Sequence, residues 1–182
     1  TNFPSQGLTY TWTPPVPVPM SFTSCNTVML NNGEVNGQGT TNNRIVQLQV
    51  LTSGSLSPLN VTAMQFATTG STNPGSDITN ARVYFTGTSS SFSTLTPFGS
   101  VIPTPNGTYT LTGNVTLGEG INYFWVTYDI ASGATIGNTL KACCPQVTGS
   151  GAMGVRTPTV SCPAGAHTVG VPVGYWTALN NP

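Results

Sequence analysis

Charged side chains are scarce in this sequence of 182 residues. Lysine and arginine number four, aspartate and glutamate also number four, and together they make up 4% of the chain, against roughly 25% in an ordinary soluble protein. Phosphate binding needs clustered cations, and the four cations are scattered, so a nucleic-acid partner is excluded. The net charge of zero leaves no repulsion between copies, and such proteins tend to associate.

The sequence also lacks a long apolar run. A membrane-spanning helix needs about 20 consecutive apolar residues, and no stretch of this chain approaches that length, so we predict no membrane span. Hydrophobic residues still make up 37% of the chain, which is enough for a core. The polar surface must therefore come from serine, threonine and asparagine, and a hydroxyl-rich surface of this kind suits an extracellular setting.

Histidine is almost absent, and this limits the chemistry that the chain can perform. The one imidazole, His167, falls in a Gly/Ala-rich segment that predicts a surface position. Hydrolysis would need a nucleophile with a base, or paired carboxylates. The carboxylates lie in separate predicted turns or strand ends, with Asp77 expected to cap the turn ahead of Ile78: Glu34, Asp77, Glu119 and Asp129. We predict no catalytic residue and no enzymatic activity.

Patterns that hold metal ions are missing as well. The sequence contains no CxxC pair and no DxDxDG loop. Zinc sites need grouped cysteine and histidine ligands, and calcium needs several converging oxygens. We therefore predict neither a metal nor a cofactor.

The four cysteines are Cys25, Cys143, Cys144 and Cys162. An even number in a charge-poor chain favours disulfides and an oxidising compartment, and buried free thiols are the alternative. Neighbouring side chains of a strand point to opposite faces, so one of Cys143 and Cys144 could reach Cys25 and the other Cys162. The first residue is Thr1, which indicates a removed targeting segment or a piece of a longer chain.

Short alternating segments between turns are the main structural signal. No long segment has a helical period, and glycine and proline recur throughout, a pattern typical of a β-sandwich or barrel. The expected strands are 20–30, 44–51, 59–68, 80–86, 108–117, 122–130, 139–147 and 156–162. Segment 122–130 is predicted to be a central strand, because it is apolar on both faces.

Several motifs in these strands resemble a known family. They are LNVT at 59–62, FATTGSTNP at 66–74, DITNARVYFTG at 77–87 and GEGINYFWVTYDI at 118–130. The stretch is similar to a domain found beside BNR-repeat neuraminidases, which recurs in large secreted bacterial surface proteins and adhesins. The resemblance implies an all-β, immunoglobulin-like antiparallel β-sandwich with an accessory or adhesive role, and it implies no catalytic residues.

The two ends of the chain differ from its middle. Apolar residues alternate with threonine and proline over residues 8–22, and with glycine and proline over residues 169–175. The prolines at 14–19 exclude a central strand. We predict an extended proline-rich inter-subunit or inter-module segment over 1–19, a β-sandwich domain over 20–168 and an extended segment over 169–182. The predicted contact residues are Leu8, Tyr10, Trp12, Val16, Val18, Val171, Val173, Tyr175 and Trp176.

Three structures for the end segments remain open. In β-augmentation, the tail of one copy fills an edge or groove of the next, and such a head-to-tail contact generates a filament. The segments could instead fold back on their own sandwich as edge strands, or serve as linkers in a tandem chain. The first and third alternatives share one function, a linear extracellular array.

These observations predict a non-enzymatic extracellular structural or adhesive module, a subunit or repeat of a surface fibre. Its partners would be other copies or adjacent modules. The alternative is a carbohydrate-binding accessory domain of a secreted sialidase-like glycosidase, with glycans as partners. Its candidate exposed contacts are Trp12, Tyr84, Tyr109 and Trp176, whereas segment 123–125 is expected in the core. Candidate glycosylation sites are Asn60, Asn106 and Asn114, and the hydroxyls of 86–96 could carry O-linked sugars.

Overall fold

The computed structural model describes residues 16–171, which form twelve strands and very little helix. The strands are β1 Ser21–Met29, β2 Val35–Gly37, β3 Asn43–Ser53, β4 Asn60–Ala67, β5 Ile78–Phe85, β6 Ile102–Pro103, β7 Thr108–Thr116, β8 Gly120–Ile130, β9 Thr139–Leu140, β10 Cys143–Gly149, β11 Val155–Arg156 and β12 His167–Gly170. A four-residue helix, α1 (Pro74–Asp77), precedes β5, and a 3-10 turn (Gly151–Met153) follows β10. None of the helical residues described here forms a segment long and apolar enough to cross a membrane.

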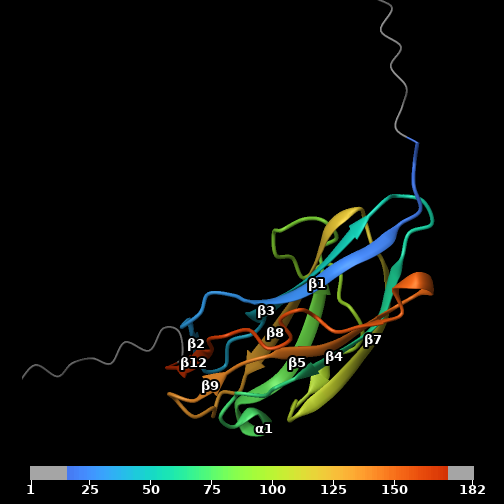
Figure 1. Ribbon diagram of the computed structural model, residues 1–182. Helices are drawn as coiled ribbons and strands as arrows, with labels where there is room; N and C mark the ends of the chain where they lie inside the picture. The colour runs from blue at the N-terminus through green and yellow to red at the C-terminus, as the bar shows by residue number, and fades with distance from the viewer. Residues whose placement is uncertain (1–15, 172–182) are drawn as a thin grey trace, which may run out of the picture.

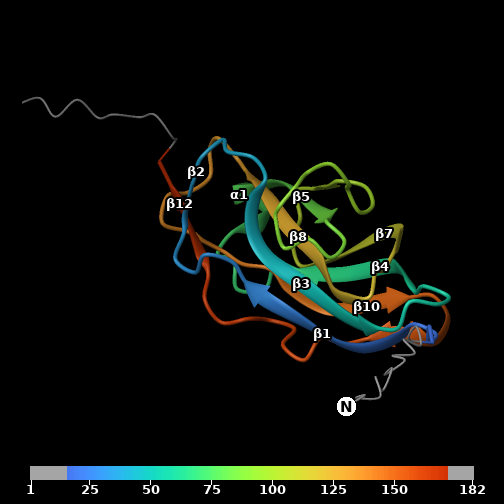
Figure 2. The same cartoon turned by 90° about the horizontal axis from the view of Figure 1, so that it is seen from above.

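Three sheets make up the domain. A five-stranded sheet has the order β1-β3-β8-β5-β6, and a four-stranded sheet has the order β11-β10-β4-β7. These two sheets enclose the core, and the three-stranded sheet β2-β12-β9 lies at one end of the sandwich (Figures 1 and 2). The predicted all-β sandwich is confirmed.

Most predicted strands are present, and β8 lies between β3 and β5 as expected of a central strand. The predicted strand 139–147 is divided into β9 and β10. Of the predicted strand 156–162, only its first residue lies in a strand, at the end of β11. Its later residues connect the two large sheets, because Thr159 N–H donates to Cys25 O (2.9 Å) and Cys144 N–H donates to Ser161 O (2.7 Å). The strand β12 crosses the predicted domain boundary at residue 168.

The core also receives a side chain from outside the strands. Phe98 lies in the connection between β5 and β6, is 1% exposed, and packs edge-on against Phe124 with ring centroids 5.7 Å apart. Gly113 of β7 makes room for it, since a Cβ at Gly113 would lie 2.8 Å from Phe98 Cε2. Residue 98 therefore closes the side of the sandwich between β5 and β7.

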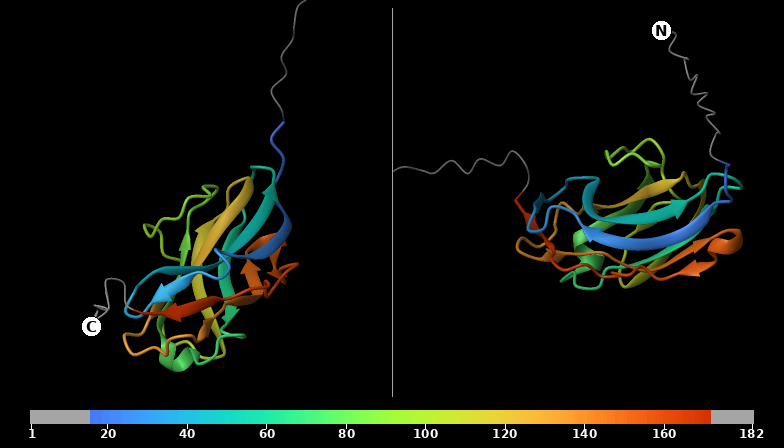
Figure 3. Two further views of the ribbon diagram at one scale, coloured as in Figure 1. Left: turned by 90° about the vertical axis from the view of Figure 1, so that its left-hand side faces the viewer. Right: turned by 45° about the horizontal axis from the view of Figure 1, so that its top comes forward.

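The two ends of the described chain lie at opposite ends of the sandwich (Figures 1 and 3). The chain enters beside the connection between β3 and β4, runs along β1, and finally leaves from β12 in the small sheet. The nine residues of β1 alone span about 30 Å at the usual rise of a strand. The fold therefore separates the point of entry from the point of exit by the length of the sandwich.

Candidate functional site

The entering segment, residues 16–19, lies along the connection between β3 and β4. Val18 O accepts hydrogen bonds from the N–H groups of Ser55 and Leu56, both at 3.0 Å. Gly54 has a φ of +83°, and a Cβ there would lie 2.5 Å from Pro19 O, so only glycine permits this close approach. The carboxylate of Glu119 accepts from Gly54 N–H at 3.1 Å. These contacts hold residues 16–19 against the sandwich.

This end of the molecule exposes apolar side chains beside a groove. Val16 is 83% exposed, Val18 56% and Leu56 46%, and we call these three residues the entry patch. A groove of about 410 Å³ is lined by Val16, Pro17, Val18, Gly54, Ser55 and Glu119. The entry patch therefore adjoins a groove whose lining combines apolar side chains with Ser55 and the carboxylate of Glu119.

A second group of exposed aliphatic residues lies at the small sheet. Val35 is 65% exposed, Ile136 55% and Val171 58%, and we call these the exit patch. The side chain of Val35 lies over Gly170, where a Cβ would be 2.2 Å from Val35 Cγ1. Ile136 precedes Gly137, whose N–H donates to Val169 O at 2.9 Å. The exit patch therefore surrounds the point where the chain leaves the domain.

Three of the predicted contact residues lie within the described range. Val16, Val18 and Val171 are exposed, as an inter-module contact would require. The remaining predicted contacts lie outside the described residues: Leu8, Tyr10, Trp12, Val173, Tyr175 and Trp176. The sequence pattern does not single out Val35, Leu56 and Ile136, because each is a single aliphatic residue and only the topology brings them to the two ends.

A long loop between β5 and β6 covers part of the outer face of the five-stranded sheet. Its Phe92 packs edge-on against Trp125 and Tyr84, with centroid distances of 5.5 Å and 5.8 Å. The guanidinium of Arg44 lies 5.6 Å from the centre of the Phe92 ring. Tyr84 is consequently only 7% exposed, so its prediction as an exposed contact is wrong because Phe92 covers it.

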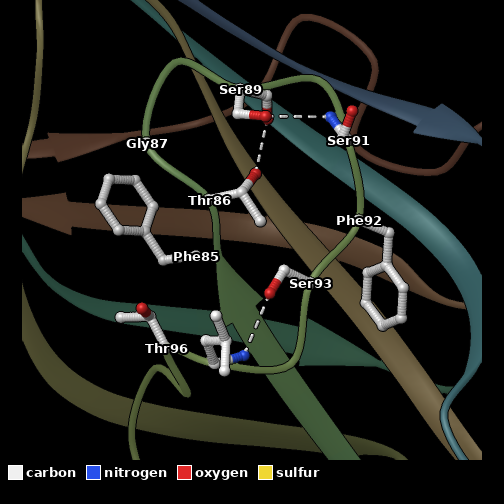
Figure 4. A pocket seen from close by; sticks show the side chains of 9 residues that line it. Phe85, Thr86, Gly87, Ser89, Ser91, Phe92, Ser93 and Thr96 are labelled. Carbon is white, nitrogen blue, oxygen red and sulfur yellow. Dashed lines mark hydrogen bonds between the residues drawn. The ribbon is translucent and has the colours of Figure 1, made fainter.

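The same loop encloses a pocket of about 460 Å³ (Figure 4). Its lining contains aromatic, aliphatic and hydroxyl side chains and no charged group: Phe85, Thr86, Gly87, Ser89, Ser91, Phe92, Ser93, Leu95 and Thr96. Ser89 Oγ accepts from Ser91 N–H, and Ser93 Oγ accepts from Leu95 N–H, both at 3.3 Å. Leu95 is 89% exposed, so the rim carries an aliphatic side chain with little cover.

Tyr109, another predicted exposed contact, is half-buried on β7. Its ring packs against Phe66 with centroids 6.2 Å apart, and burial raises its pKa. Of the candidate glycosylation sites, Asn106 and Asn114 are exposed, while Asn60 is half-buried at the start of β4.

The four cysteines have two different states. Cys143 forms a disulfide with Cys162, but Cys25 and Cys144 are buried free thiols, so the disulfide prediction is wrong for these two. Cys144 points into the core because it neighbours Cys143 on β10, whose side chain points to the other face. Burial raises the pKa of Cys25 to about 11 and that of Cys144 to about 12. Both thiols therefore stay protonated and poorly reactive at neutral pH.

The lone histidine is buried, which corrects the predicted surface position. His167 is 0% exposed, because β12 lies between β2 and β9. Its Nδ1 accepts from Asn36 Nδ2 at 3.0 Å, and its Nε2–H donates to Leu30 O. The imidazole therefore joins β2, β12 and the end of β1, and neither ring nitrogen faces solvent.

Two buried carboxylates also hold the fold together. Asp77 accepts from Thr135 N–H and Asn138 Nδ2, both at 2.8 Å. It thus fastens the connection between β8 and β9 through its side chain, instead of capping the turn before Ile78 as predicted. Asp129 forms an ion pair with Arg82 on the neighbouring strand β5. Within residues 16–171, no three histidine, cysteine or acidic residues converge to hold a metal ion.

Comparisons with known proteins agree with this architecture. Residues 37–152, more than half of the chain, match a family model described as the N-terminal domain of BNR-repeat neuraminidase. Among solved structures, the chain is similar to one titled "Hadza microbial sialidase Hz136", with a TM-score of 0.59 and 14% sequence identity. The match covers 80% of this chain and 31% of that one, and at this identity it shows the fold alone. No curated protein matches the chain.

Proposed function

The chain belongs to the family of N-terminal domains of BNR-repeat neuraminidases, and we propose that it is a non-enzymatic, extracellular structural module of a linear surface array. One observation carries this proposal. The chain enters at one end of the sandwich and leaves at the other, and both ends expose aliphatic side chains. A module built in this way can be joined to its neighbours in line.

The extracellular part of the proposal rests on chemistry. A disulfide between Cys143 and Cys162 is stable in oxidising compartments and rare in the cytosol. The surface relies on hydroxyl and amide groups, since charged residues make up only 4% of the chain. The buried side chains of Asp77, Asp129 and His167 each bond to a neighbouring strand or connection. Such bonds favour a structural role over catalysis.

Deleting residues 1–19 tests the proposal. The deletion removes the alternating segment and the strip that lies on Ser55 and Leu56, so we expect end-to-end assemblies to disappear while the sandwich still folds. Sedimentation velocity and electron microscopy measure assembly, and thermal unfolding measures folding. Deleting residues 1–7 is the matched control and should leave assembly intact. Assemblies that persist unchanged without residues 1–19 would contradict the proposal.

A second candidate is a carbohydrate-binding accessory role. The pocket in the β5–β6 loop favours it, because apolar side chains pack against the apolar faces of sugars while hydroxyls meet their polar edges. A glycan array and calorimetric titration with neutral oligosaccharides should show saturable binding that Leu95→Ala weakens. Val160→Ala, which alters an exposed aliphatic residue away from the pocket, is the control. Absence of binding on the array argues against this role.

A further inference from the structure

Exposed aliphatic residues are concentrated at the two ends of the sandwich. Eleven large aliphatic residues are exposed within the described range, and six of them form the entry and exit patches. Soluble proteins usually avoid grouped apolar exposure unless the surface makes a contact. The charged groups beside the patches are two carboxylates. Glu119 lines the entry groove and accepts from Gly54 N–H, and the exposed Glu34 precedes Val35 and accepts from Asn31 Nδ2.

We propose that the two patches are the two halves of one head-to-tail interface, in which the entry patch of one module packs against the exit patch of the next. This inference rests on the proposed linear array and names the surfaces that join it. The partner is therefore a second copy of this chain.

The positions of the two patches favour a contact between the entry patch of one copy and the exit patch of another. The patches lie at opposite ends of the sandwich, separated by at least the length of β1, about 30 Å. The entry patch and the exit patch of one molecule therefore cannot contact each other. A contact between unlike surfaces leaves one free patch at each end of every dimer, so addition continues in line.

The entry end also offers a concave surface that exposed aliphatic side chains can occupy. Val16 and Val18 of the entry patch line one side of the groove of about 410 Å³. The exit patch offers three aliphatic side chains, each more than half exposed. Burying aliphatic groups in a groove is favourable because it removes their surface from water, and the chain as a whole carries no net charge that would repel another copy.

Blocking one end at a time tests the interface in the full chain. Val18→Asp places a carboxylate in the entry patch, and Ile136→Asp places one in the exit patch. Each variant alone should associate at least about tenfold more weakly than the wild type, since the contact would bury an unpaired charge. A 1:1 mixture of the two variants should form dimers and nothing larger, because it contains one intact entry patch and one intact exit patch per pair.

Sedimentation velocity over a range of concentrations distinguishes the outcomes. Val160→Asp, at an exposed aliphatic residue that belongs to neither patch and to neither pocket, is the control and should associate like the wild type. The inference is overturned if either end variant associates like the wild type, or if the mixture stays monomeric. If the wild type assembles but either of these results is found, the two patches do not form the interface. The linear array would then be joined through the terminal segments alone. A wild-type chain that stays monomeric at every concentration contradicts both proposals.

Discussion

Replacing Phe98 with alanine should lower the free energy of unfolding by about 3–5 kcal/mol, the usual cost of deleting a buried phenylalanine ring. The ring is 1% exposed and packs edge-on against Phe124 in the core. Gly113 leaves a space that only this ring fills, so its loss creates a cavity between the sheets. Urea unfolding of both proteins measures the difference.

The control for this prediction lies in the same loop. Phe92 is half-buried on the outer face of the five-stranded sheet, where it packs against Tyr84 and Trp125. Phe92→Ala should therefore cost clearly less than Phe98→Ala. Equal losses from the two substitutions would show that residue 98 does not close the core as described.

Breaking the disulfide is the second change with a large expected effect. Cys143 and Cys162 are separated by 19 positions in the sequence, and closing a loop of that size stabilises a fold by about 3 kcal/mol. Cys162→Ser should lower the unfolding free energy by about that amount. Reductant should destabilise the wild type to a similar extent and leave the variant unchanged.

A thiol count provides the independent check on the disulfide. The unfolded, unreduced wild type should contain two reactive thiols, from Cys25 and Cys144, and the folded protein at neutral pH should contain almost none. Four reactive thiols in the unfolded, unreduced protein would show that the bond between Cys143 and Cys162 does not form.

The long strands of the two large sheets could be predicted from the sequence because each carries its own alternating pattern, whereas the two-residue edge strand β6 was not predicted. Segment 122–130 is apolar on both faces, and only a strand with neighbours on both sides buries such a segment. The structure places β8 between β3 and β5. Three of the four motifs shared with the neuraminidase-associated family lie mainly in β4, β5 and β8, which is why the resemblance and the periodicity led to the same fold.

The small sheet and the two patches could not be predicted in this way. The strands β2 and β9 have three and two residues, too few for a periodic pattern, and β12 follows a Gly/Ala-rich segment that predicts a loop. His167 was therefore expected at the surface, although β12 places it between two strands. Likewise, Val35 and Ile136 are 101 positions apart in the numbering, and only the topology brings them to one end.

The cysteines illustrate the limit of local geometry. The opposite directions of Cys143 and Cys144 followed from strand alternation, but alternation does not say which partner lies on which face. The connection after β11 brings Cys162 to Cys143, whereas Cys25 and Cys144 face the core as thiols. Long-range topology, which the sequence pattern does not contain, decides the pairing.

Electron microscopy of the full-length chain at assembly-competent concentration tests the linear array most directly. The account predicts modules strung end to end, with the end that contains Val18 and Leu56 facing the end that contains Val35 and Ile136 of the next module. Particles that remain single, or that associate side by side through the faces of their sheets, would contradict it.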